Sequence, residues 1–168
     1  DLNALESGKQ LAAGGGSLTA LSIGSEAALG SSKIQKDILS RGADELKLVM
    51  DDGKPFQDSL QTAKAIAEAV GTIGQYDLVL CGMGSSDLYF QEVGVQVGEL
   101  LGVPALNNVT GIKPAGEGVL EVERTLEDEV EVLEVPLPAV LSVSSEINTP
   151  SVPAMRDIMR AGKKPVDK

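Results

Sequence analysis

Small residues that could hold a phosphate group follow an apolar stretch in the middle of the chain. Residues 78–81 (LVLC) are typical of a buried strand, and the run Gly82-Met83-Gly84-Ser85-Ser86-Asp87 comes next. Such a turn lets the backbone approach a ligand closely. The amphipathic helix expected after it, which ends at Gly102, would point free N–H groups and the positive end of its dipole at an anion. We therefore predict a phosphate cradle here.

The motif by itself is weak. It resembles the first half of a dinucleotide fingerprint, but Asp87 stands where a third glycine would be, and no Gly-Lys-Ser/Thr follows as in a P-loop. The alternative is a plain turn between strand and helix, with Ser86 or Asp87 as the N-cap. Gln91 and Glu92, about one turn after that cap, are expected to face the mouth of the site. Gly94 and Gly98 would leave one helix face smooth, so that another backbone can pack against it.

A second small-residue turn gives the first one a partner. Ser22-Ile23-Gly24-Ser25 follows the strand expected over residues 18–23. In an open parallel sheet both turns would lie at the carboxyl edge, where ligands bind. The simplest prediction is an adenine nucleotide. Its phosphates would contact backbone N–H groups, and its base would pack on the apolar strand ends.

The residue types argue against an enzyme. The chain has no His, which removes imidazole bases, Ser-His-Asp triads and most zinc sites. The single Cys81 closes a strand and is interpreted as a core residue, because free cysteines are among the most buried residues. Asp87 could act as a base, although capping or ribose contact is the preferred role. We predict no catalytic residue and no metal site.

The net charge of −11 argues against nucleic acid and anionic membranes as partners, because both need a basic surface. The simpler interpretation of this negative charge is that it keeps the protein soluble. No apolar run approaches the roughly 20 residues that span a bilayer, and no signal peptide is visible. The expected location is cytoplasmic.

Alternating strand and helix patterns predict an α/β fold, a Rossmann-like parallel sheet with flanking helices. Residues 118–135 change to an apolar-polar alternation and predict a β-hairpin with Glu121, Glu123 and Glu131 outward, around a solvated acidic turn. We expect a nucleotide-binding domain over 1–145 and a C-terminal docking arm over 146–168. The expected helices are 2–13, 32–40, 59–70 and 154–160, and the other strands are 45–50, 77–81, 107–113 and 138–144.

The C-terminal stretch resembles the signature of electron transfer flavoprotein (ETF) beta subunits. The family pattern is roughly arginine-leucine-asparagine-x-proline, five or so variable residues, then asparagine-isoleucine-methionine-lysine and a basic run ending in proline. Glu146 and Asp157 depart from it. The segments DLVLCGMGSSDLYFQEVG (77–94) and ERTLEDEVEVLEVPLPAVLSV (123–143) are similar to the family as well, and the former is closest to the Fix branch, associated with anaerobic carnitine metabolism or nitrogen fixation. The matching residues of the signature are Ile147, Asn148, Pro150, Ile158, Met159, Arg160, Lys163, Lys164 and Pro165.

The resemblance implies an electron-carrier subunit that is not catalytic alone. It would form a heterodimer with an ETF alpha subunit and share a FAD that takes electrons from flavin dehydrogenases. It would also bind AMP or a second FAD itself. The family usually has asparagine, glutamine and threonine where this chain has Gln91, Glu92 and Val93. Carried over by position, the implied nucleotide contacts are Ser22, Ile23, Gly24, Gly82, Gly84, Ser85, Asp87, Gln91, Glu92 and Val93.

The resemblance also assigns the tail to partner docking. Residues 150–159 match the loop by which the family docks acyl-CoA-type dehydrogenases, with Met155 where an anchoring apolar residue sits. By the same comparison the chain is expected to be truncated at both ends. The rival class is a stand-alone adenine-nucleotide regulator of the universal-stress type. An ATP-pyrophosphatase would need a Ser-Gly-Gly-x-Asp-Ser loop, which the chain lacks. The implied docking residues are Pro150, Val152, Met155, Ile158 and Met159.

Overall fold

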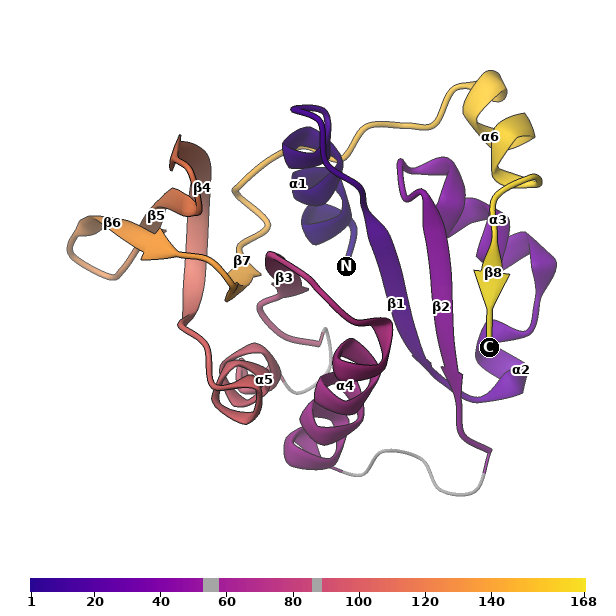
Figure 1. Ribbon diagram of the computed structural model, residues 1–168, viewed down its shortest axis with the longest axis horizontal. Coiled ribbons are helices and arrows are strands. Elements are labelled where there is room, and N and C mark those ends of the chain that lie inside the picture. The colour runs from indigo at the N-terminus through magenta and orange to yellow at the C-terminus, as the bar shows by residue number, and fades with distance from the viewer. Residues whose placement is uncertain (53–57, 86–88) are drawn as a thin grey trace. The chain divides into compact units, whose positions relative to one another are not determined.

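The computed structural model describes residues 1–52, 58–85 and 89–168 (Figure 1). The chain forms two compact units, which we call the first and second units. The first contains Asp1–Ala4 and Asp58–Thr149, and the second contains Leu5–Gln57 and Pro150–Lys168. The fold is α/β, as predicted, with parallel strands, flanking helices and a hairpin. Residues Pro150–Lys168 thus belong to the same unit as Leu5–Gln57. The domain bounds predicted from the sequence, with a docking arm from residue 146, stay a prediction.

The first unit is built on a five-stranded sheet in the order β3-β7-β4-β5-β6. Its first three strands, β3 (Leu78–Gly82), β7 (Ala139–Val143) and β4 (Ala105–Gly116), are parallel. Antiparallel pairing then adds β5 (Val119–Thr125) and β6 (Val130–Pro136). Every residue of β7 is buried, which fits an interior strand with parallel neighbours on both sides.

Two helices of the first unit pack against each other, α4 (Ser59–Ile73) and α5 (Val93–Leu101), and α5 also lies on β4 and β7. A Cβ added at Gly94 would come within 2.0 Å of Ser142 Oγ, and one at Gly98 within 2.3 Å of the Ala105 Cβ. The smooth helix face predicted from these glycines is therefore confirmed. Gly102 ends α5 in the left-handed conformation (φ 68°), as its sequence position suggests.

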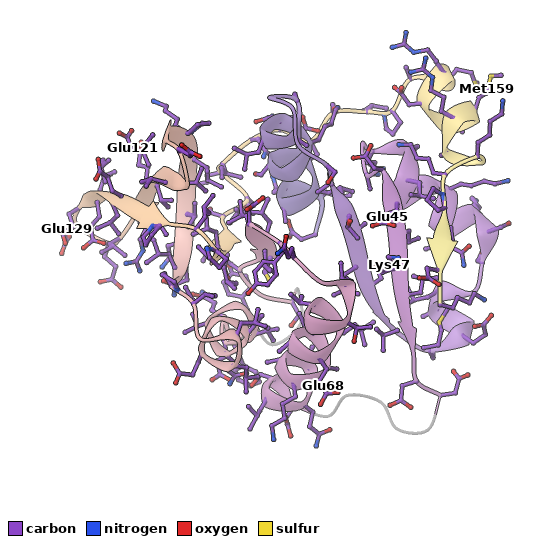
Figure 2. The ribbon with its side chains drawn as sticks, in the orientation of Figure 1. Glu45, Lys47, Glu68, Glu121, Glu129 and Met159 are labelled. Atoms are coloured by element: carbon purple, nitrogen blue, oxygen red, sulfur yellow. The ribbon has the colours of Figure 1, made fainter. Side chains whose placement is uncertain are left out.

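The hairpin is confirmed, with one correction. Glu121 and Glu123 are exposed, as is the acidic turn 127–129, and Figure 2 shows Glu121 and Glu129 on the hairpin. Glu131 instead lies on the face of β6 that also carries Leu133 and Val135. Its carboxylate forms an ion pair with Arg124 at 3.1 Å on the facing strand, and this partner lets a charged residue occupy the inward register.

The second unit has a three-stranded parallel sheet, β1-β2-β8. Its strands are β1 (Thr19–Gly24), β2 (Glu45–Met50) and β8 (Val166–Asp167), which lie side by side in Figure 1. A buried cluster that includes Leu39, Leu46 and Ala161 forms the core of this unit. Its helices are α2 (Glu26–Leu29), α3 (Ser32–Ser40) and α6 (Met155–Ala161), and most of α1 (Leu2–Ala12) also belongs to it.

Most predicted elements are present with shifts of one to a few residues. Two short elements, α2 and β8, were not predicted. Helix α4 continues through Gly71, where the sequence predicted its end, and stops at Gly74, which has a φ of 105°. Strands β1 and β3, which precede the two small-residue turns, belong to different sheets, whereas the sequence predicted one sheet for both.

Candidate functional site

The turn after β3 depends on two glycines. A Cβ at Gly84 would lie 3.0 Å from the Tyr89 ring and 3.3 Å from the Tyr89 Cα. A Cβ at Gly82 would lie 2.5 Å from the Asp1 carboxylate. Gly84 and Ser85 are exposed, so the backbone of this turn is open to a ligand. The close backbone approach predicted for Gly82, Gly84 and Ser85 is therefore possible.

Helix α5 begins later than the sequence predicted. Its first residue is Val93, and its N-cap is Glu92, without a capping hydrogen bond from the side chain. The N-cap of α5 is thus later than the predicted Ser86 or Asp87, both of which lie outside the described residues. Gln91 and Glu92 precede the helix instead of following its first turn. The predicted cradle thus consists of a longer segment between β3 and α5.

That segment has unusual backbone geometry. Tyr89 and Gln91 have positive φ values of 49° and 59°, and Asn108 in β4 has a φ of 55°. Asparagine tolerates the left-handed region, but tyrosine and glutamine adopt it rarely. Residues held in such conformations cluster at functional sites, because the surrounding structure must stabilise them. The three positions therefore mark this end of the first unit as a candidate site.

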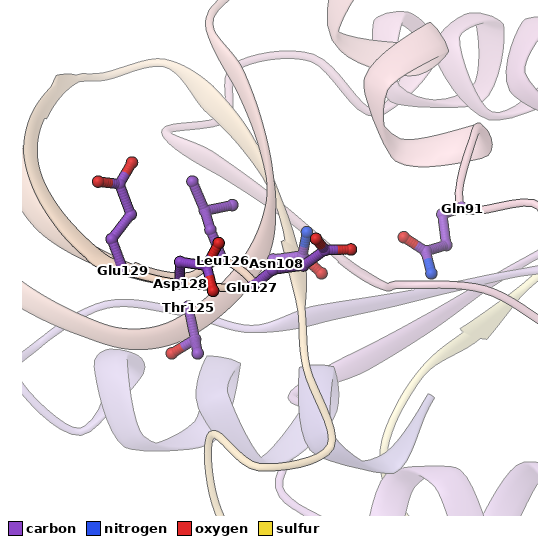
Figure 3. Close-up of a pocket in the computed structure, with 7 residues that line it drawn as sticks. All are labelled: Gln91, Asn108, Thr125, Leu126, Glu127, Asp128 and Glu129. Carbon is purple, nitrogen blue, oxygen red and sulfur yellow. The ribbon is translucent and has the colours of Figure 1, made fainter.

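A cavity of about 700 Å³ confirms that two of these positions share a surface. It is lined by Gln91 and Asn108 together with Thr125 and residues 126–129 of the hairpin turn. Figure 3 shows Gln91 across from the cluster of the other lining side chains. The lining carries the carboxylates of Glu127, Asp128 and Glu129 and two side-chain amides. It suits the hydrogen-bonding edge of a base or sugar and disfavours a phosphate.

Two carboxylates near the predicted turns accept hydrogen bonds at helix starts, those of α4 and α2. Glu92 Oε2 accepts a hydrogen bond from Ser59 Oγ at 2.6 Å, and Ser59 is the first residue of α4. In the second unit, Asp52 Oδ1 accepts from the backbone N–H of Glu26 at 2.8 Å, directly after the turn 22–25. Ser25 Oγ caps the same helix by accepting from Ala28 N at 3.2 Å. At these positions the protein supplies its own acceptors.

Ser22, Ile23 and Gly24 are the last residues of β1 and pair in parallel with β2. They belong to the second unit, whereas the residues from Gly82 to Val93 belong to the first. The structure therefore brings Gly82, Gly84, Ser85, Gln91, Glu92 and Val93 into one unit, and it places the other three in the other.

Cys81 is not an activated nucleophile. Although the residue as a whole is partly exposed, desolvation of its thiol raises the pKa to about 11, so the thiol is protonated at neutral pH. Among the described residues, no group of three or more His, Cys, Asp or Glu side chains could hold a metal ion. Within the same described part of the chain, no helix is long and apolar enough to cross a membrane.

A comparison with protein families decides how this site is interpreted. The model of the electron transfer flavoprotein domain matches residues 1–168. The chain belongs to the electron transfer flavoprotein domain family. Members of this family carry electrons and bind flavin, so the small-residue turns and the strained segment belong to a flavoprotein domain.

The residues of this ETF domain fit an adenine nucleotide in part. The cradle at Gly82 and Gly84, which a Cβ would fill, leaves room for close backbone contact, and Gln91 and Asn108 supply amides for a base or ribose. The cavity lining described above contains no basic side chain, so phosphate binding would depend on backbone N–H groups. Sequence reasoning missed Asn108 and the hairpin turn. The doublet Asn107-Asn108 near the start of β4 was the available signal.

The segment predicted for docking is exposed in the ETF domain. Val152 is 91% exposed, Met155 72% and Met159 70%, and Figure 2 shows Met159 on α6. Ile158 is less exposed, and Pro150 is partly buried. Behind them the chain is held firmly, since Ala161 is buried and Lys164 Nζ donates to the carbonyl of Leu39 at 3.0 Å. The exposed side chains are therefore followed by a segment that packs against the second unit. Their role in docking stays a prediction.

Proposed function

We propose that this chain is the beta-type subunit of an electron transfer flavoprotein of the Fix-like branch. It would pair with an alpha-type subunit, share a FAD with it, and carry electrons from flavin dehydrogenases to an acceptor in the cytoplasm. The flavin supplies the electron-accepting ring system when bound. The family match over the whole chain supports the electron-carrier part of this proposal, and the resemblance of residues 77–94 and of the C-terminal signature supports the beta type and the Fix-like branch. The glycine turn followed by Tyr89 and Gln91 in strained conformations supports a ligand site.

In this proposal the chain also binds an adenine nucleotide, AMP or a second FAD, at the segment between β3 and α5. Backbone N–H groups near Gly84 and Ser85 would contact the phosphates, because Gly84 has no Cβ and both residues are exposed. Gln91 and Asn108 would bind the base or ribose through their amides. Gly82, Asp87, Glu92 and Val93 complete the proposed set at this segment. For Ser22, Ile23 and Gly24 of the second unit, nucleotide contact stays a prediction from the resemblance.

We assign dehydrogenase docking to the exposed apolar side chains around α6. Val152, Met155 and Met159 present apolar surface next to Arg156 and Arg160. Exposed apolar groups that cluster on a soluble chain mark interaction sites. Ile158, which is also exposed, and the partly buried Pro150 would complete this surface.

The nucleotide content of the purified heterodimer tests the proposed site. The chain is co-expressed with an alpha-type subunit, the complex is denatured, and released AMP and FAD are quantified by chromatography. Gly84→Ala should lower the adenine nucleotide bound per complex severalfold, because the new Cβ would displace Tyr89. Gly71→Ala is the matched control, since a Cβ there meets nothing within 4 Å. Equal nucleotide content in the two variants would rule out the cradle, and a complex without adenine nucleotide would rule out the binding function.

A further inference from the structure

We propose that Met155 and Met159 form a peroxide-sensitive modification site on α6. Oxidation of both thioethers to sulfoxides makes this exposed surface polar and weakens docking of the dehydrogenase. The reactant is a small hydroperoxide, of which hydrogen peroxide is the simplest. The effect on docking rests on the proposed function, whereas the order in which the methionines react depends on this chain alone.

The chain has four methionines, and two of them are clearly more exposed than the others. Met155 is 72% exposed and Met159 is 70% exposed, and they lie four residues apart, on one side of α6. Met50 is half-buried and packs against the core of the second unit, and Met83 is half-buried after β3. Because oxidation follows access to the sulfur, Met155 and Met159 should react first.

The reaction needs only the side chain and the peroxide. A lone pair on the methionine sulfur attacks one peroxide oxygen, so that an S–O bond forms and the O–O bond breaks. The sulfur gives two electrons to the peroxide, and the second oxygen takes up the proton of the first and leaves as water. A methionine sulfoxide reductase reverses the change, because a dithiol takes the sulfoxide oxygen as water and becomes a disulfide.

The end of α6 holds the helix in place through residues other than the two methionines. Ala161 is 1% exposed and belongs to the buried cluster of the second unit. Lys164 Nζ donates to the carbonyl of Leu39 at 3.0 Å. Sulfoxides at Met155 and Met159 would point into solvent and would leave both contacts intact. Oxidation should therefore change the surface without unfolding the unit.

The oxidised side chain also has a polar neighbour. Arg156 lies three residues before Met159, a spacing that places the two side chains next to each other on a helix. The side chain of Arg156 is 74% exposed, and its Nε is 4.0 Å from the carboxylate of Asp157. Its N–H groups can donate to a sulfoxide oxygen. Burial of that polar group in an apolar pocket of a partner is costly, whereas burial of a thioether is favourable.

The test treats the purified heterodimer with increasing hydrogen peroxide and maps the added oxygen by peptide mass spectrometry. Met155 and Met159 should be oxidised severalfold faster than Met50 and Met83. Stopped-flow reduction by an acyl-CoA-type dehydrogenase then compares each protein with its own untreated sample. The natural protein should lose about fivefold or more of its rate at limiting dehydrogenase, as expected when an interface loses an anchor. A sulfoxide reductase with a dithiol should restore the rate, and thermal unfolding should stay unchanged throughout.

Two variants locate the effect. The double variant Met155→Leu, Met159→Leu keeps an apolar surface of similar volume but has no thioether there, so its own rate should be the same before and after peroxide. Met50→Leu is the matched control and should lose its rate as the natural protein does. The alpha-type subunit is the same in every sample, so its oxidation would affect all of them equally.

Three results would overturn the inference. The first is an equal oxidation rate for all four methionines, and the second is the same loss of rate in the double variant as in the natural protein. The third is a loss that coincides with unfolding of the natural protein. If the untreated natural protein accepted no electrons from the dehydrogenase, the proposed docking would fail, and the effect on docking with it. The order of oxidation would still decide whether α6 carries the modification site.

Discussion

The carboxylate of Glu6 accepts hydrogen bonds from both the hydroxyl and the backbone N–H of Ser151, at 2.8 and 3.2 Å. Lys9 Nζ donates to the same hydroxyl at 2.7 Å, and Gln10 Nε2 donates to the other carboxylate oxygen at 3.1 Å. All four residues belong to the second unit. They fix residue 151 against α1, immediately before the exposed side chains of the proposed docking surface.

Glu6→Gln should destabilise the second unit. The side chain is only 10% exposed, and it loses charge-assisted hydrogen bonds worth about 1–2 kcal/mol in free energy of unfolding. Urea unfolding at neutral pH measures this loss. Glu68→Gln on α4, where the carboxylate is exposed, is the control and should leave the midpoint unchanged. An equal shift in both variants would contradict a specific role for Glu6.

The same contact predicts a pH dependence. Burial acts to raise the pKa of Glu6, but hydrogen bonds from Ser151 and Gln10 outweigh it and hold the pKa below its ordinary value of 4.5. A lowered folded-state pKa adds stability at pH values above the unfolded-state pKa, and this stability is lost as the pH falls through the folded-state pKa. The difference between the natural protein and Glu6→Gln should therefore shrink in acid. A difference that stays constant down to the acid transition would contradict this assignment.

Gly98→Ala should destabilise the first unit. The new Cβ would lie 2.3 Å from the Ala105 Cβ, so α5 must shift on β4, at a cost of about 1–3 kcal/mol. Gly71→Ala in α4 meets no atom within 4 Å and should instead stabilise the unit by about 0.5–1 kcal/mol through helix propensity. Opposite signs in chemical denaturation are the expected result. Two changes of the same sign would show that the spacing between α5 and the sheet is adjustable.

Met155→Ala should slow electron transfer from the partner dehydrogenase and leave folding intact. Met155 is 72% exposed, so its truncation removes little packing, while an apolar anchor at an interface contributes about 1–3 kcal/mol to binding. Stopped-flow reduction of the flavin at limiting dehydrogenase measures the effect. Val132→Ala, at a 60% exposed position on the hairpin, is the control. Equal electron-transfer rates in the Met155→Ala and Val132→Ala variants would contradict docking through α6.

Cys81 should resist alkylation in the folded protein. Desolvation raises the pKa of its thiol to about 11, so the reactive thiolate is scarce at neutral pH. Iodoacetamide labelling followed by mass spectrometry should show slow modification of the native complex and fast modification in denaturant. Equal rates in the two conditions would mean that the thiol is accessible and ionised.

Local sequence patterns predicted the regular elements well, because burial follows periodicity in both the helices and the hairpin. They failed where a tertiary partner decides the outcome. Glu131 occupies an inward register because Arg124 pairs with it from the facing strand. Two-residue β8 exists through its pairing with Leu46 and Lys47, supported by a 3.0 Å ion pair between Lys47 and Asp167, and Figure 2 labels Lys47 on β2. The sequence pattern at residues 166–167 does not by itself predict a strand.

The sequence indicated where to look for the candidate site but not its shape. The glycines at 82 and 84 drew attention to the turn after β3, although a plain turn between strand and helix was the alternative. The start of α5 could not be placed from the sequence, because Tyr89 and Gln91 adopt positive φ values that their residue types disfavour. That backbone path moves Glu92 to the N-cap and brings Gln91 to the cavity with Asn108.

The absorbance spectrum of the purified heterodimer, with flavin counted per complex, tests the central claim most directly. An electron carrier of this family should be yellow, lose its flavin absorbance on stepwise reduction, and regain it on reoxidation. A second FAD in this chain would give two flavins per heterodimer, whereas AMP in this chain would give one. A folded, paired complex that is colourless and takes up no FAD would contradict the assignment of this chain as an electron-carrier subunit.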